Sequence, residues 1–290
     1  MPAIKLIHAL ATDPGRVRSR NEDAAAAAPG LGAYLVCDGM GGAAGGEVAS
    51  RLAIETVLDH LAVSAPANEA AVEDGRRAGA GRTYGVDAKA QTRLHTALYA
   101  ANQAVFRKAA ERTQLSGMGT TLVALLHVPG PEKDRRLTPR SPEQQFVRPP
   151  TLFLANVGDS RCYRRRGGEL LQLSTDHSFV EEQLLAGQIT AEQAAISPMR
   201  NYITRAIGPQ THVEPDIQSY RPQTGDVYLL ASDGLTRELT NAEIAGVLSR
   251  TIRSEPPLQT ELQAACQGLI EAANANGGLD NITVLLLAFV

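Results

Sequence analysis

Four aspartates stand at the ends of short apolar runs in this chain, and their placement constrains the fold more than any other feature. Apolar runs of this length, bounded by Gly, Asp or Asn, are typical of buried strands. The four residues are Asp38 after 34–37, Asp159 after 152–157, Asp233 after 227–231 and Asp280 before 282–290. A buried carboxylate costs free energy unless it is compensated, and no basic residue is adjacent in sequence to any of the four. We therefore expect a metal to compensate them, and their all-oxygen chemistry favours Mg2+ or Mn2+ over zinc.

The simplest alternative for each aspartate is a turn. An Asp before a Gly most often forms a tight turn, because Asp bonds to the local backbone and Gly adopts positive φ. Asp38-Gly39 and Asp233-Gly234 each fit that interpretation when taken alone. Four aspartates in matching positions favour the metal interpretation for the set.

Composition predicts a folded protein of the reducing cytoplasm. The 290 residues are 43% hydrophobic and 20% charged, which is enough for a well-developed core. A net charge of −3 gives no reason to expect a nucleic-acid partner. The three cysteines are scattered through apolar segments, which favours buried free thiols over disulfides. We expect no signal peptide and no membrane span, because Lys5 and His8 interrupt the first apolar stretch and the longest one, 282–290, is too short.

Hydrophobic periodicity separates predicted strands from predicted helices. The predicted strands are 4–11, 34–37, 121–128, 151–157 and a hairpin of 162–165 with 170–173. The predicted helices are 47–63, 90–112, 179–186, 191–196, 244–250 and 258–273. Residues 64–89 resemble a loop in composition, and the Pro-rich segment 129–150 resembles an exposed insertion. Hairpins without regular βαβ alternation predict an antiparallel α+β fold.

Six short motifs occur in order along the chain. They are Arg18-Ser19-Arg20-Asn21-Glu22-Asp23, Cys37-Asp38-Gly39-Met40-Gly41-Gly42, Gly117-Met118-Gly119-Thr120-Thr121, Val157-Gly158-Asp159-Ser160-Arg161, Ala231-Ser232-Asp233-Gly234 and Asp280-Asn281-Ile282-Thr283. Together they resemble the motif series of the PP2C-type (PPM) metal-dependent serine/threonine protein phosphatases, in their bacterial form, from about Thr12 to the end of the sequence. The resemblance implies one domain over 1–290, a four-layer α-β-β-α sandwich with two central antiparallel sheets flanked by helices. It also implies a flap at 176–207 beside the active site.

The resemblance assigns ligands to two core Mn2+ or Mg2+ ions. Asp38, Asp233 and Asp280 would bind these ions, with the carbonyl of Gly39 as a further ligand. Asp159 matches the position that helps to hold a third, weaker ion in bacterial members. The charges of four carboxylates and two divalent ions sum to about zero. Without metal, the carboxylates would repel one another and raise each other's pKa.

The resemblance also assigns roles near the N-terminus. Arg18 matches the arginine that grips substrate phosphate, which a guanidinium can bond through two oxygens at once. A solvated surface arginine is the alternative, and Arg16 and Arg20 compete for the role. Glu22 and Asp23 match acids that hold metal-bound waters, with an exposed turn as the alternative. Arg18, Asp38 and Asp233 are thus the residues expected to carry catalysis.

The implied reaction is hydrolysis of phosphoserine and phosphothreonine in proteins. A water or hydroxide bridging the two ions would attack in line, so no protein nucleophile is needed. Met40 stands where eukaryotic relatives have a histidine thought to act as general acid, and methionine cannot donate a proton. The expected partners are phosphorylated proteins, including a bacterial Ser/Thr kinase or its targets, and we expect a monomer. Two alternatives stay open: a pseudophosphatase that only docks phosphoproteins, and a phosphatase acting on a phosphorylated anti-sigma antagonist.

Overall fold

Two five-stranded antiparallel sheets form the centre of the computed structural model, which describes residues 5–41, 45–64, 81–130 and 149–290. One sheet has the order β1 (Leu6–Asp13), β12 (Ile282–Phe289), β11 (Val227–Ala231), β8 (Arg161–Arg166) and β9 (Glu169–Gln172). The other has the order β10 (Asp216–Tyr220), β7 (Thr151–Val157), β6 (Leu122–Val128), β3 (Ala33–Cys37) and β2 (Ala24–Ala28). β4 (Gly39–Met40) and β5 (Gly119–Thr120) form a separate two-stranded sheet.

The central strands are apolar on both faces because both faces are covered. All eight residues of β12 are buried. Leu285, Leu287 and Phe289 pack toward the other sheet, against residues such as Tyr34 and Val123. The alternate residues of β12, from Ile282 to Ala288, pack against the outer helices. This two-sided burial explains why 282–290 is a continuous apolar run and does not alternate with polar residues.

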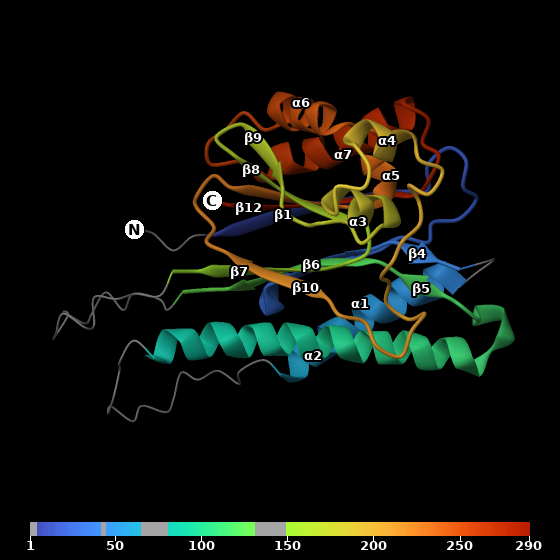
Figure 1. The fold of residues 1–290 in the computed structure, drawn as a ribbon. Helices are drawn as coiled ribbons and strands as arrows, with labels where there is room; N and C mark the ends of the chain where they lie inside the picture. Colours follow the sequence, from blue (N-terminus) through green and yellow to red (C-terminus); the bar gives the residue numbers. More distant parts are fainter. Residues whose placement is uncertain (1–4, 42–44, 65–80, 131–148) are drawn as a thin grey trace.

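Helices cover the outer face of each sheet (Figure 1). On one side lie α1 (Gly45–Val63) and α2 (Gly81–Glu111), and on the other α6 (Asn241–Thr251) and α7 (Gln259–Ala275). The shorter helices are η1 (Pro29–Leu31), η2 (Thr113–Leu115), α3 (Phe179–Leu185), α4 (Ala191–Ile196) and α5 (Asp233–Thr236). A capping box begins α6, with Thr240 and Glu243 exchanging hydrogen bonds. The α-β-β-α sandwich expected from the sequence is confirmed.

The prediction of a loop over 64–89 is wrong for its last part. Helix α2 begins at Gly81, ahead of the predicted start at residue 90. The Asp87 carboxylate accepts hydrogen bonds from Thr151 on β7 and from Arg221, and these contacts fix the early turns on the sheet. Residues 65–80, and 131–148 of the predicted insertion, lie outside the described residues. No helix in the described part of the chain is long and apolar enough to cross a membrane.

Candidate active site

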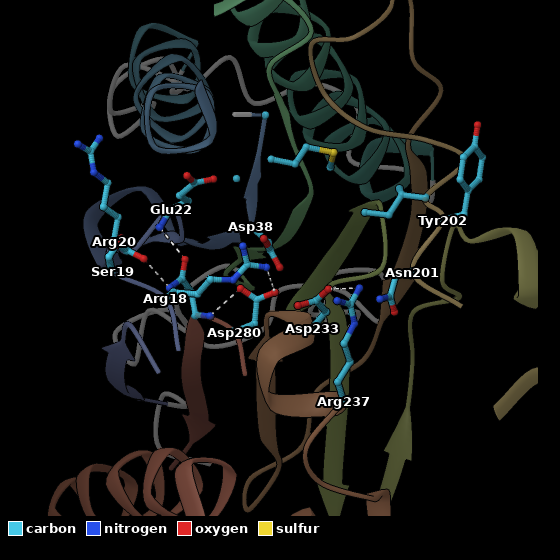
Figure 2. Close-up of a pocket in the computed structure, with 15 residues that line it drawn as sticks. Arg18, Ser19, Arg20, Glu22, Asp38, Asn201, Tyr202, Asp233, Arg237 and Asp280 are labelled. Carbon is cyan, nitrogen blue, oxygen red and sulfur yellow. Dashed lines mark hydrogen bonds and ion pairs between the residues drawn. The ribbon is translucent and has the colours of Figure 1, made fainter. Parts of the chain in front are cut away.

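A polar cavity of about 870 Å³ opens where the two sheets meet the loops at one end of the sandwich. The predicted site residues that line it are Arg18, Glu22, Asp38, Gly39, Asp233 and Asp280 (Figure 2). Asp23 and Asp159 are buried behind the lining and do not form part of it. The fold therefore brings together residues that are more than 250 positions apart in the sequence, such as Arg18 and Asp280, which are 262 positions apart.

Two threonines hold the backbone at Asp38. The hydroxyl of Thr121 accepts a hydrogen bond from the Asp38 amide at 3.0 Å. The Thr120 hydroxyl and the Thr121 amide both donate to the Asp38 carbonyl, each at 2.9 Å. The Thr121 hydroxyl also bonds to that of Ser160, next to Asp159, at 2.6 Å. The hydroxyls of both threonines thus fix the position of a candidate metal ligand.

Gly39 lies where only glycine fits. A Cβ at this position would lie 2.2 Å from the Gly46 carbonyl oxygen and 2.5 Å from that of Glu22. A Cβ on Gly46 would likewise lie 2.1 Å from the Glu22 carboxylate. Gly39 and Gly46 thus allow close packing between the start of α1 and the loop that follows Asp38.

Asn281 ties the N-terminal loop to the start of β12. Its side-chain amide donates to the carbonyls of Pro14 at 3.0 Å and Arg20 at 2.8 Å, and its carbonyl accepts from the Glu22 amide at 2.8 Å. These three bonds place the loop that carries Arg18 beside Asp280. Asn281 belongs to the last of the six motifs, but the sequence alone gives it no role because its partners are remote in the chain.

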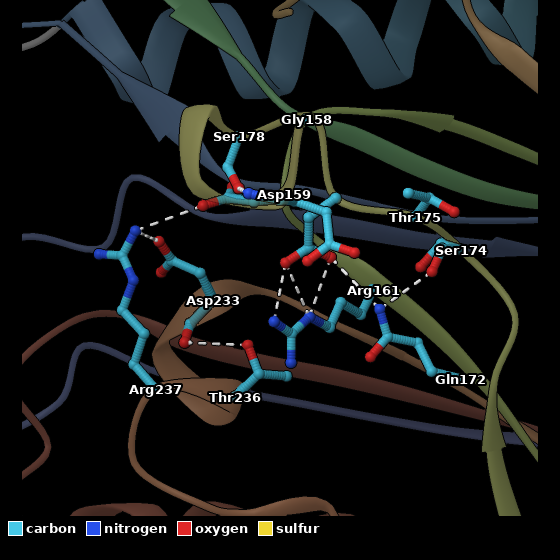
Figure 3. A network of polar contacts seen from close by, with 12 residues as sticks. Gly158, Asp159, Arg161, Gln172, Ser174, Thr175, Ser178, Asp233, Thr236 and Arg237 are labelled. Atoms are coloured by element: carbon cyan, nitrogen blue, oxygen red, sulfur yellow. Dashed lines mark hydrogen bonds and ion pairs between the residues drawn. The ribbon is translucent and has the colours of Figure 1, made fainter. Parts of the chain in front are cut away.

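Two arginines contact the carboxylates directly. Arg18 Nη2 lies 2.9 Å from Asp280 Oδ2, and its side chain is 57% exposed. Arg237, on the helical turn that follows Asp233, forms an ion pair with Asp233 and lies 3.3 Å from Asp159 Oδ2 (Figures 2 and 3). Arg237 was not predicted from the sequence. Its spacing of four residues from Asp233 on a helix is the signal that could have found it.

The buried carboxyl groups have raised pKa values. Burial, followed by repulsion from Asp233, raises the pKa of Asp159 to about 7, although Arg237 opposes the shift. Burial raises the pKa of Asp23 to about 8, with weaker contributions from Asp233 and Asp280. Burial also raises the pKa values of Asp38 and Asp233, and repulsion from Asp233 adds to the effect on Asp38. The cluster therefore resists carrying its full negative charge unless a cation is close by.

The donor chemistry of this cluster fits a hard divalent cation. Both carboxylate oxygens of Asp23, and one each of Asp159 and Asp233, are buried without a hydrogen-bond partner. Such oxygens are costly unless a cation or donor meets them. Within the described residues no three acidic, His or Cys side chains converge into a complete cation cage. The carboxylates instead contact Arg18 and Arg237.

His177 is a buried anchor and not a cavity residue. Its Nδ1 accepts a hydrogen bond from the Gly158 amide at 3.1 Å, and its Nε2 faces Asp216 at 3.3 Å. Burial lowers the pKa of His177. Because Nδ1 accepts from a backbone amide, the ring is neutral with its proton on Nε2. His177 is thus absent from the cavity lining and bonds to the backbone at Gly158, next to Asp159.

Comparison with known proteins identifies the family. A family model described as Protein phosphatase 2C matches residues 16–138. The serine/threonine phosphatase stp of Listeria innocua is 32% identical over 279 residues, which cover 95% of this chain and 93% of that protein. The serine/threonine protein phosphatase PstP of Mycobacterium tuberculosis is 33% identical over 281 residues, which cover 97% of this chain but 44% of that longer protein.

A solved structure agrees with the sequence comparisons. The crystal structure of the catalytic domain of PstP in complex with two manganese ions superposes with a TM-score of 0.72 at 32% identity and covers 99% of each chain. These matches confirm the resemblance stated from the six motifs. This chain belongs to the PP2C-type family of metal-dependent serine/threonine protein phosphatases.

Proposed function

We propose that this chain is a Mn2+- or Mg2+-dependent phosphatase that removes phosphate from phosphoserine and phosphothreonine in proteins. The observation that carries the proposal is the cluster of buried carboxylates, with unpaired oxygens, at the wall of a cavity that also holds Arg18. No cysteine takes part: burial raises the pKa values of Cys37, Cys162 and Cys266, so these thiols are not activated nucleophiles.

The residues that would hold two divalent ions are Asp38, Asp233, Asp280 and the carbonyl of Gly39. The hydroxyls of Thr120 and Thr121 fix the backbone at Asp38. The start of α5 holds Asp233, and the hydrogen bonds of Asn281 hold the backbone beside Asp280. When bound, the two ions activate a water for in-line attack on phosphorus and neutralise charge on the phosphate. The family pattern gives Asp159 to a further cation, a role that its contact with Arg237 opposes. Glu22 and Asp23 would orient waters around the cluster.

Arg18 is the best candidate to bind the substrate phosphate. It lines the cavity, it is more than half exposed, and its guanidinium lies next to Asp280. A guanidinium can donate to two phosphate oxygens at once. Of its competitors Arg20 also lines the cavity, whereas Arg16 does not. Arg18 also contacts the carboxylate of Asp280, one of the proposed metal ligands, which favours it for this role.

The segment 176–207 contributes to one wall of the cavity, and this wall would face a protein substrate. Asn201, Tyr202 and Ile203 line the cavity on this side. The two helices of the segment, α3 and α4, have no buried residues, and Leu185 and Ile196 are exposed. Exposed apolar side chains on a segment that also lines the cavity suit peptide residues that flank a phosphoserine. We expect the substrates to include a Ser/Thr kinase or its targets.

Phosphatase assays with controlled metal test the proposal. We expect hydrolysis of p-nitrophenyl phosphate and phosphothreonine peptides only with added Mn2+ or Mg2+, and none after treatment with EDTA. Re-addition of Mn2+ should restore the rate, which separates metal removal from irreversible unfolding. Full activity in protein shown to be metal-free would refute the mechanism. A lack of activity on every phosphopeptide, in folded and metal-loaded protein, would favour the docking alternative.

A further inference from the structure

Arg237 bridges two carboxylates that would otherwise face each other without a positive charge (Figure 3). Its Nη2 contacts Asp233 and lies 3.3 Å from Asp159 Oδ2. Both carboxylates are nearly buried, with side-chain exposures of 10% and 7%, whereas Arg237 is 33% exposed. The guanidinium therefore reaches from the cavity into the carboxylate cluster.

The other arginine near Asp159 is already engaged. Arg161 is two residues from Asp159 in the sequence, but its Nε and Nη2 bond to the Asp176 carboxylate at 2.7–3.0 Å. This two-pronged ion pair is the preferred geometry of an arginine with a carboxylate. Arg237 is thus the guanidinium that contacts Asp159 within the described part of the chain.

We infer that Arg237 supplies the positive charge that a third metal ion would otherwise bring to Asp159, so that this chain binds two Mn2+ ions and excludes a third. This inference rests on the proposed function, because it takes Asp38, Asp233 and Asp280 as the ligands of the two core ions. A guanidinium stays charged at every pH at which the protein folds, so protonation cannot switch its charge off. A divalent ion at Asp159 would have to displace Arg237 or lie next to a like charge in a poorly solvated place.

The bridge also has a consequence for the metal-free protein. Removal of Arg237 would leave Asp159 and Asp233 buried without a cationic partner, which destabilises a fold more than loss of an exposed ion pair does. Added Mn2+ can then stabilise the variant by binding at the freed carboxylates. Either Arg237 or a third ion can supply the positive charge beside Asp159 and Asp233, but not both.

Metal stoichiometry tests the inference without reference to activity. Mn2+ binding is measured by calorimetric titration and by metal analysis after gel filtration for the wild type, Arg237→Ala, Asp159→Asn and the double variant. We expect two equivalents in the wild type and three in Arg237→Ala. The third equivalent should disappear in the double variant, and Asp159→Asn alone should keep two. Arg237→Lys, which retains a positive charge, should also keep two.

Thermal unfolding supplies a second readout and the control. In EDTA, Arg237→Ala should melt below the wild type, and its melting temperature should rise more on addition of Mn2+. Arg107→Ala, which removes an exposed arginine of α2 outside the cavity, should change neither quantity. If Arg237→Ala does not fold in EDTA, Arg237→Gln, prepared and titrated in Mn2+, gives the same count.

Two results would overturn the inference. One is a wild type that binds a third Mn2+ equivalent through Asp159. The other is an Arg237→Ala variant that binds the same number of ions as the wild type, which would make Arg237 a residue for substrate phosphate instead. Failure of the proposed function would look different, because phosphatase activity would then be absent from the wild type at any metal content.

Discussion

Replacing Asp23 by Asn should stabilise the metal-free protein at neutral pH, against the usual effect of a core substitution. Neither oxygen of this buried carboxylate has a hydrogen-bond partner at normal geometry. Burial raises its pKa to about 8 from 3.8; the nearby hydroxyls of Thr283 and Ser232 oppose the shift, and Asp233 and Asp280 add to it. The folded protein therefore holds the Asp23 proton more tightly than the unfolded chain. Wherever the folded state binds more protons, stability falls as the pH rises.

The pH window and the magnitude follow from this shift. Below about pH 3.8 both states are protonated and Asp23 costs nothing through ionisation. Between 3.8 and about 8 the unfolded chain releases the proton and the folded protein retains it, so stability falls by about 1.4 kcal/mol per pH unit at most. At pH 7 the limit is roughly 4 kcal/mol, and because other carboxyls share the effect we expect a gain of about 2–4 kcal/mol for Asp23→Asn. The Asn amide can bond to the hydroxyls of Thr283 or Ser232, which lie beside Asp23.

Urea unfolding in EDTA at several pH values measures this gain. The difference between Asp23→Asn and the wild type should grow from pH 5 to pH 8, and saturating Mn2+ should stabilise the wild type more than the variant. Asp59→Asn, at an exposed position of α1, is the matched control and should change little. A stability difference that does not depend on pH, or a variant less stable than the wild type at pH 8 in EDTA, would refute the electrostatic reasoning.

Two further predictions concern turnover. Asp38→Asn and Asp233→Asn should each lower kcat on p-nitrophenyl phosphate by about 100-fold or more, because each weakens the cluster that would hold the core ions. Steady-state kinetics in saturating Mn2+ measures this loss. A loss of less than about threefold would mean that these ligands are wrongly assigned. Replacement of the exposed residues Gln188 or Tyr202 should lower kcat/KM more for a phosphoprotein than for p-nitrophenyl phosphate, because a loop bordering a site shapes the choice of large substrates. Equal losses on both substrates would leave the segment 176–207 a structural role only.

The fold and the acidic cluster could be predicted because their signals are local. A run such as 282–290 is apolar over its whole length, and the motifs around Asp38 and Asp233 are contiguous in the sequence. The partners of these residues could not be predicted in the same way. The contact of Arg237 with Asp159 joins residues 78 apart, and Asn281 bonds to the Arg20 carbonyl 261 positions away. No periodicity encodes such pairs, which exist only after the sheets have assembled.

The early turns of α2 were missed for a related reason. Residues 81–89 are rich in Gly and charge, so local propensity favours a loop. Contacts of Asp87 with Thr151 and Arg221 stabilise the helix from outside its own sequence. Tertiary contacts override propensity here, as they do for many helix ends.

The position of β12 in the sheet affects how the protein folds during its synthesis. This strand follows all the others in the chain, yet it lies inside its sheet, paired with β1 on one side and β11 on the other. During synthesis β1 is made before β12 and cannot pair with it until residues 282–289 emerge. Pairings between such distant segments form slowly because a long loop must close. Asp280, just ahead of β12, can join the other carboxylates only at that moment. The four aspartates therefore cannot come together in the nascent chain until β12 is in place.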